Sequence, residues 1–66
     1  MNEERMLKWF EFSHLPPDLQ QVSGQFHALA TGLCEVTEPG PERTVALRKL
    51  LEAKDAAVRA RLHPGG

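Results

Sequence analysis

The sequence has one cysteine, no tyrosine and no apolar run long enough to cross a membrane. Cys34 has no second cysteine to form a disulfide with, and its spacing from the three histidines matches no common zinc-binding pattern. A transmembrane helix needs about 18 consecutive apolar residues, and the polar, acidic start of the chain does not resemble a signal peptide. We therefore expect a protein of the cytoplasm, with no metal ion, cofactor or membrane partner.

Motifs of covalent catalysis and of phosphate loops are also missing. The serines and threonines lie in no GxSxG-like context, and the glycines are not spaced as in a phosphate-binding loop. A buried active-site cleft is hard to build from 66 residues, so we expect the chain not to be an enzyme. The net charge of −1 gives little attraction for a polyanion, so we expect no DNA or RNA polymer as a partner.

Charge is distributed unevenly along the chain. Residues 1–42 contain seven acidic and two basic side chains, a net charge of −5, whereas residues 43–66 contain two acidic and six basic ones, a net charge of +4. This asymmetry can hold two antiparallel helices together, or it can gather positive charge at a site for an anionic ligand. Exposed charge without a further role is the more common case, and the sequence leaves these interpretations open.

Prolines divide the chain into a short N-terminal segment and two long helices. The pattern predicts an N-terminal aromatic helix or arm over residues 1–15, an αα-hairpin over residues 16–63 and a C-terminal tail over residues 64–66. Within the hairpin we expect helices over residues 17–36 and over residues 41 to about 62, because each range begins with proline followed by an acidic residue. The short linker between them makes the two helices antiparallel.

Large apolar side chains recur on the first predicted helix at intervals of three and four residues. They are Leu19, Val22, Phe26, Leu29, Leu33 and Val36. This spacing predicts an apolar stripe packed against a neighbouring helix, interrupted by Gly24 at a cost of about 1 kcal/mol relative to alanine. The second helix offers mainly alanines between its leucines and valines. A single core of this size supplies about 3–5 kcal/mol, so we expect an all-α protein that assembles as a homo-oligomer.

All tryptophan and phenylalanine side chains except Phe26 lie in one short stretch near the N-terminus. Such rings can stack on purine bases, at about 1–3 kcal/mol per base, or they can anchor the segment on its own hairpin or on a neighbouring subunit. The arginines and lysines of the second helix are suited to phosphate contacts. His14, beside the prolines, can donate to a phosphate or a base, or cap the following helix.

Three stretches of the chain together resemble a family of phage proteins. These are FEFSHLPP at residues 10–17, FHALA at residues 26–30 and GPERTVALRKLLEAKDAAVRA at residues 40–60. In their order and spacing they resemble the hairpin-domain proteins of the anti-CBASS and anti-Thoeris sponge type. The resemblance extends over residues 9–62, which is most of the chain.

The resemblance implies a phage protein of the host cytoplasm that binds cyclic di- or trinucleotide immune signals without cleaving them. It also implies that small helical hairpins assemble into a compact homo-oligomer, commonly a hexamer, with ligand pockets between protomers. The alternative, from a different functional class, is a small helical protein–protein interaction module or virion-associated structural module with no nucleotide ligand.

The resemblance further implies which residues contact the ligand. Phe12 stands at the position of a base-stacking aromatic that is often tyrosine in the family, so the ring face is kept and the hydroxyl is missing. The family often has a basic residue in the first helix, whereas the corresponding residues 23–25 include none. Arg43 and Thr44 match the start of the family's second helix. The expected ligand-binding residues are Trp9, Phe12, His14, Arg43, Thr44, Lys54 and Arg59.

Overall fold

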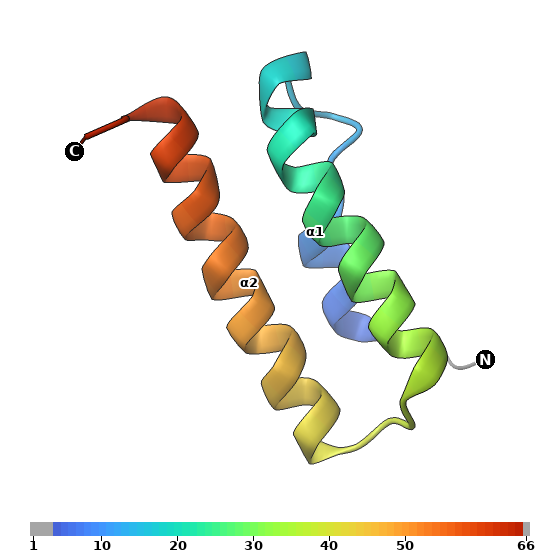
Figure 1. Cartoon of the computed structure of the whole chain (residues 1–66). Helices are drawn as coiled ribbons and strands as arrows, with labels where there is room; N and C mark the ends of the chain where they lie inside the picture. Colours follow the sequence, from blue (N-terminus) through green and yellow to red (C-terminus); the bar gives the residue numbers. More distant parts are fainter. Residues whose placement is uncertain (1–3, 66) are drawn as a thin grey trace.

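The computed structural model describes residues 4–65 and contains three helices and no strand in that range. They are the short 3-10 helix η1 (Arg5–Phe10) and the long helices α1 (Pro17–Val36) and α2 (Pro41–Leu62). Figure 1 shows α1 and α2 side by side and antiparallel, joined by a short connection. The prediction of an all-α hairpin is confirmed, with both long helices at their predicted bounds. Within residues 4–65, no helix has the length and apolar character needed to span a membrane.

The ends of the long helices follow from local chemistry. Each long helix has proline at its first position, where the missing N–H has no carbonyl partner to lose. At the start of α1, the Gln20 side chain donates to the Leu15 carbonyl at 2.8 Å and to the Ser13 carbonyl at 3.3 Å. These bonds fasten the incoming segment to the first turn. The bounds of the helices are therefore determined by nearby residues.

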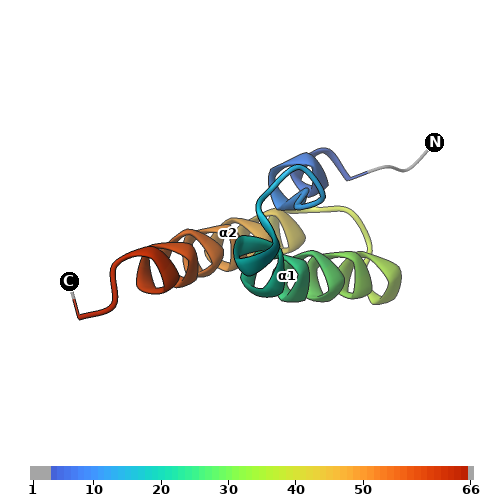
Figure 2. The same cartoon turned by 90° about the horizontal axis from the view of Figure 1, so that it is seen from above.

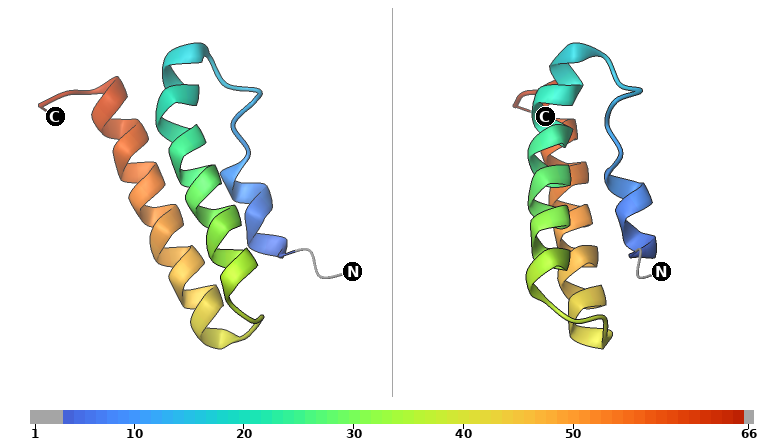
Figure 3. Two further views of the ribbon diagram at one scale, coloured as in Figure 1. Left: turned by 45° about the vertical axis from the view of Figure 1, so that its right-hand side comes forward. Right: turned by 90° about the vertical axis from the view of Figure 1, so that its right-hand side faces the viewer.

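Helix η1 lies against one face of the layer that α1 and α2 form (Figures 2 and 3). From there the Phe10 side chain is fully buried, together with Ala30 of α1 and Leu47 of α2. Partly buried apolar side chains surround these three. They are Met6, Leu7, Phe26, Cys34, Leu50 and Leu51. The core therefore depends on an aromatic residue from outside the hairpin.

The apolar stripe of α1 is buried only in part, so the prediction that it forms the packed side of the helix was wrong for two of its members. None of its six residues is fully buried, and Leu29 and Val36 remain 52% and 78% exposed. The buried positions of α1 are Ser23 and Ala30. Phe10 gives the physical reason, because its ring needs space between the helices and small side chains on α1 leave that space.

Candidate functional site

A pocket lies between the N-terminal half of α1 and the C-terminal half of α2. Its volume is about 280 Å³. The lining residues come from the segment before α1, from α1 and from α2, and they are Leu15, Leu19, Ser23, Lys54, Asp55, Val58 and Arg59. We call it the interhelical pocket. It brings together two of the predicted cations, Lys54 and Arg59, with a carboxylate, a hydroxyl and an apolar wall.

Ser23 is the buried polar residue of this pocket. Only 1% of the residue is exposed, and its Oγ has no hydrogen-bond partner among the described residues. A helical serine commonly satisfies its hydroxyl by donating to the carbonyl four residues earlier, and a buried hydroxyl without a partner costs free energy. The Ser23 hydroxyl therefore lies in the wall of the pocket with its hydrogen-bonding capacity unused.

Lys54 connects α2 to η1. Its Nζ donates to the Trp9 carbonyl at 2.6 Å, lies 5.9 Å from the centre of the Phe10 ring and is 4.0 Å from the Asp55 carboxylate. The side chain is 15% exposed. Lys54 therefore stabilises the fold and also contributes positive charge to one wall of the pocket.

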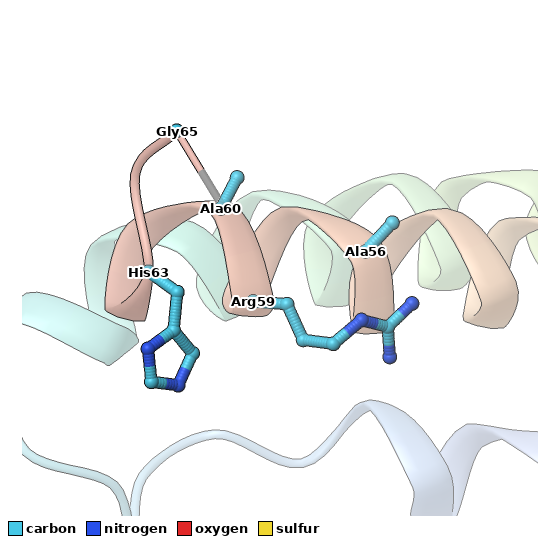
Figure 4. Close-up of a pocket in the computed structure, with 5 residues that line it drawn as sticks. All are labelled: Ala56, Arg59, Ala60, His63 and Gly65. Atoms are coloured by element: carbon cyan, nitrogen blue, oxygen red, sulfur yellow. The ribbon is translucent and has the colours of Figure 1, made fainter.

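Arg59 is the cation of the pocket with unused hydrogen-bonding capacity. It is exposed, and within residues 4–65 its side chain makes no hydrogen bond or ion pair. It also lines a neighbouring hollow of about 390 Å³ with His63 and the alanines of the last turns of α2. Figure 4 shows Arg59 and His63 on one side of α2, toward the N-terminal segment, and Ala56 and Ala60 on the other. Five guanidinium donors are thus available to an incoming anion.

Arg43, in contrast, is used within the fold. It is 8% exposed, and its Nε and Nη2 donate to one oxygen of the Glu4 carboxylate at 3.0 and 2.8 Å. Its Nη1 donates to the carbonyls of Thr37 at 2.9 Å and Cys34 at 3.3 Å, at the end of α1. One side chain thus fastens η1, α1 and α2 together. The structure places Arg43 in this network and not beside Lys54 and Arg59.

Glu4 is the residue that completes this network, and no local pattern in the sequence indicates this role. The hydrogen bond from Arg43 lowers the pKa of the Glu4 carboxyl below its ordinary value of 4.5, helped by a further bond from the Met6 amide. The two partners are 39 residues apart in sequence. Only the packing of η1 across the hairpin brings them together.

Phe12 packs against α1. Its ring centre is 5.2 Å from that of His27, and a β-carbon added to Gly24 would lie 3.3 Å from its Cε2. Gly24 therefore gives the ring close access to the helix backbone, which explains a glycine in the middle of α1. Phe12 is half-buried, so one part of its surface is used in the fold and another part is open.

Trp9 and Thr44 meet in a different hollow beside η1. This hollow has a volume of about 350 Å³ and is completed by Glu4, Arg5, Met6 and Lys8. Trp9 is 53% exposed, with the Lys8 Nζ 5.0 Å from the centre of its ring. An exposed indole beside two cations is suited to stacking on a base. Neither Arg5 nor Lys8 was among the predicted site residues.

The predicted residues therefore form two neighbouring groups and three separate positions. Lys54 and Arg59 line the interhelical pocket, Trp9 and Thr44 line the hollow beside η1, and the bond from Lys54 to the Trp9 carbonyl joins the two groups. Phe12 lies on α1, Arg43 lies in the buried network, and His14 is exposed in the turn before α1. Ser23 was not among the predicted site residues, because only its burial in the folded chain distinguishes it from the other serines.

Within the part of the chain that the structure describes, no group of three or more histidine, cysteine or carboxylate side chains is placed to hold a metal ion. Comparison with known protein families, curated proteins and solved structures gave no match.

Proposed function

We propose that this chain is a phage-type sponge that binds cyclic di- or trinucleotide immune signals and sequesters them in the host cytoplasm without cleaving them. The observation that carries the proposal is the interhelical pocket, where Lys54 and Arg59 lie together with the unpartnered, buried hydroxyl of Ser23. The resemblance of residues 9–62 to the sponge proteins supports it independently.

The chemistry of the pocket matches a nucleotide in three ways. The Arg59 guanidinium can bind two phosphate oxygens at once, and Lys54 adds a second positive charge to the same pocket. Leu15, Leu19 and Val58 offer an apolar surface to a base or a ribose ring. The exposed Trp9 ring beyond Lys54 can stack on a base.

The size of the pocket favours a shared site. Its volume of about 280 Å³ lies just below the range of about 300–1,000 Å³ that is usual for ligand pockets. A cyclic di- or trinucleotide bound there would extend out of one chain and contact another. We therefore propose a homo-oligomer, with a hexamer favoured, in which a second protomer completes each site.

A second candidate function is a protein–protein interaction or virion-associated structural module without a nucleotide ligand. The observation that favours it is the exposed part of the apolar stripe. Within the part of the chain that the structure describes, no neighbouring side chain buries Leu29 or Val36. The two functions differ in a thermal-shift screen with cyclic nucleotides. A ligand at 100 times its Kd adds about 2.7 kcal/mol to stability, whereas a pure interaction module shows no shift.

The direct test is retention followed by recovery. The protein is incubated with 3′,3′-cyclic di-AMP or cyclic tri-AMP and filtered, and the retained protein is digested with protease before chromatography. We expect the cyclic nucleotide to leave the filtrate and to be recovered intact. Recovery of a linear product would show hydrolysis, and a filtrate that keeps every probe, including cyclic dinucleotides with guanine, would contradict the proposal.

Retention by the Arg59→Ala variant tests whether the nucleotide binds in the interhelical pocket. A hydrogen bond to a charged group contributes about 1.5–3 kcal/mol, so we expect retention to weaken about tenfold or more. Arg48→Ala is the matched control, because Arg48 is exposed on the same helix and lines none of the pockets described above. Both variants should keep the helicity of the parent chain. Equal retention by the two variants would show that the interhelical pocket is not the site.

A further inference from the structure

The hairpin has one face that no described residue covers. Helix η1 lies over the opposite face, as the view along the layer shows (Figure 2). Phe12 packs against His27 on the covered side of α1, and Leu29 follows His27 by two positions, about 200° around the helix. Leu29 therefore points away from η1, and Val36, two turns later, lies on the same side. We call this the open face.

The two helices contribute different side chains to the open face. Helix α1 presents the exposed part of its apolar stripe, with Leu29 52% and Val36 78% exposed. Helix α2 presents small side chains, since Ala56 and Ala60 point away from the N-terminal segment in Figure 4. Ala53, one turn before Ala56, is also exposed. A ridge of large apolar side chains thus lies beside a strip of alanines, which the exposed Lys49 precedes by one turn.

The chain as a whole exposes more surface than a compact monomer of its mass. The chain exposes 4912 Å². A compact monomer of 7.4 kDa exposes about 4,200 Å² on the usual scaling with mass. The excess of about 700 Å² is close to the roughly 800 Å² that each partner buries in a standard protein–protein interface.

The shape and charge of the chain favour a second copy as that partner. In a two-fold pair, the ridge of each chain lies on the alanine strip of the other, so both halves of the face are used at once. This pairing also sets residues 17–36 of one chain beside residues 41–62 of the other. Residues 17–36 contain two acidic and no basic side chains, a net charge of −2, and residues 41–62 contain three acidic and six basic ones, a net charge of +3, so the contact brings opposite charges together.

We propose that two copies of this chain pair through their open faces, with Leu29 and Val36 of each resting on the alanines of the partner's α2. The pairing refines the homo-oligomer of the proposed function and does not depend on the nucleotide. It leaves η1 and the interhelical pocket on the outside of the pair, where a protomer of another pair would complete the site.

Sedimentation equilibrium without any ligand tests the pairing. We expect the unmodified chain at about 10 µM to be a dimer or an even-numbered assembly of dimers. Leu29→Glu should weaken the association at least about 100-fold, since it would bury a carboxylate without a partner. Ala28→Glu is the matched control, because Ala28 is exposed and adjacent but lies off the open face, and it should associate like the parent.

A second variant guards against unfolding of the first. Ala53→Glu places the same charge on the α2 side of the open face at an exposed position that the fold of one chain does not need buried. With helicity intact by circular dichroism, it should also dissociate the pair. A monomeric parent chain, a trimer, or loss of association in Ala28→Glu but not in Leu29→Glu and Ala53→Glu would overturn the proposal. A dimer that retains no cyclic nucleotide would uphold the pairing and contradict the proposed ligand.

Discussion

On the face that η1 covers, polar groups are paired across long sequence distances, whereas the open face has exposed apolar side chains. Arg43 binds Glu4 and two carbonyls of the α1 end, and Lys54 binds the Trp9 carbonyl. On the open face, Leu29 and Val36 remain exposed. The difference teaches that directional bonds fix how a single chain folds, while the exposed part of the apolar stripe is not used in that fold.

The largest effect is expected from the buried network of the covered face. Arg43→Ala leaves the Glu4 carboxylate, 13% exposed, without its cation and leaves two carbonyls without a donor. Removing one partner of a buried pair costs about 3–5 kcal/mol, and we expect about 3 kcal/mol here because Glu4 keeps some contact with solvent. Urea denaturation at a fixed protein concentration measures the change.

Arg48→Ala is the control for this experiment, since Arg48 is exposed on the same helix. Its unfolding free energy should stay within about 0.5 kcal/mol of the parent. Equal stability of the two variants would mean that the Arg43 network contributes nothing specific to the covered face.

A smaller effect is expected from acid. The pKa of Glu4 is lowered in the folded chain by Arg43, so the unfolded chain binds more protons at low pH. The stability that this pair contributes is therefore complete above pH 4.5 and is lost as the pH falls through the lower folded-state value. Thermal unfolding of the parent and of Glu4→Gln, measured from pH 7 down to pH 3, should show the steeper acid loss in the parent. Parallel curves would contradict the assignment.

The smallest effect separates two glycines of α1. The β-carbon of an alanine at position 32 would have no neighbouring atom within 4 Å. Gly32→Ala should therefore stabilise the helix by about 0.5–1 kcal/mol. Alanine at Gly24 would lie 3.3 Å from the Phe12 ring, which must shift, so Gly24→Ala should gain little or nothing. Chemical denaturation compares the two variants, and an equal gain would show that Phe12 does not pack closely on α1.

The positions of the helices were predictable because they depend on near neighbours. Proline and an acidic residue at each helix start, and the break between the helices, act within one turn of the chain. The arrangement of the site was less predictable. Lys54 and Arg59 were predicted from the sequence, but their closeness to Ser23 depends on how α1 packs against α2. The spacing of residues within one helix carries no information about the packing of two helices.

The amino-acid sequence by itself determined that this protein is an all-α hairpin whose helices run over residues 17–36 and 41–62, because helix starts and stops are local. Only the tertiary structure decided which cations are used in the fold and which side of α1 is buried. The physical reason is the placement of η1. Once Phe10 enters between the helices, Ala30 and Ser23 turn inward, Glu4 reaches Arg43, and part of the apolar stripe turns outward.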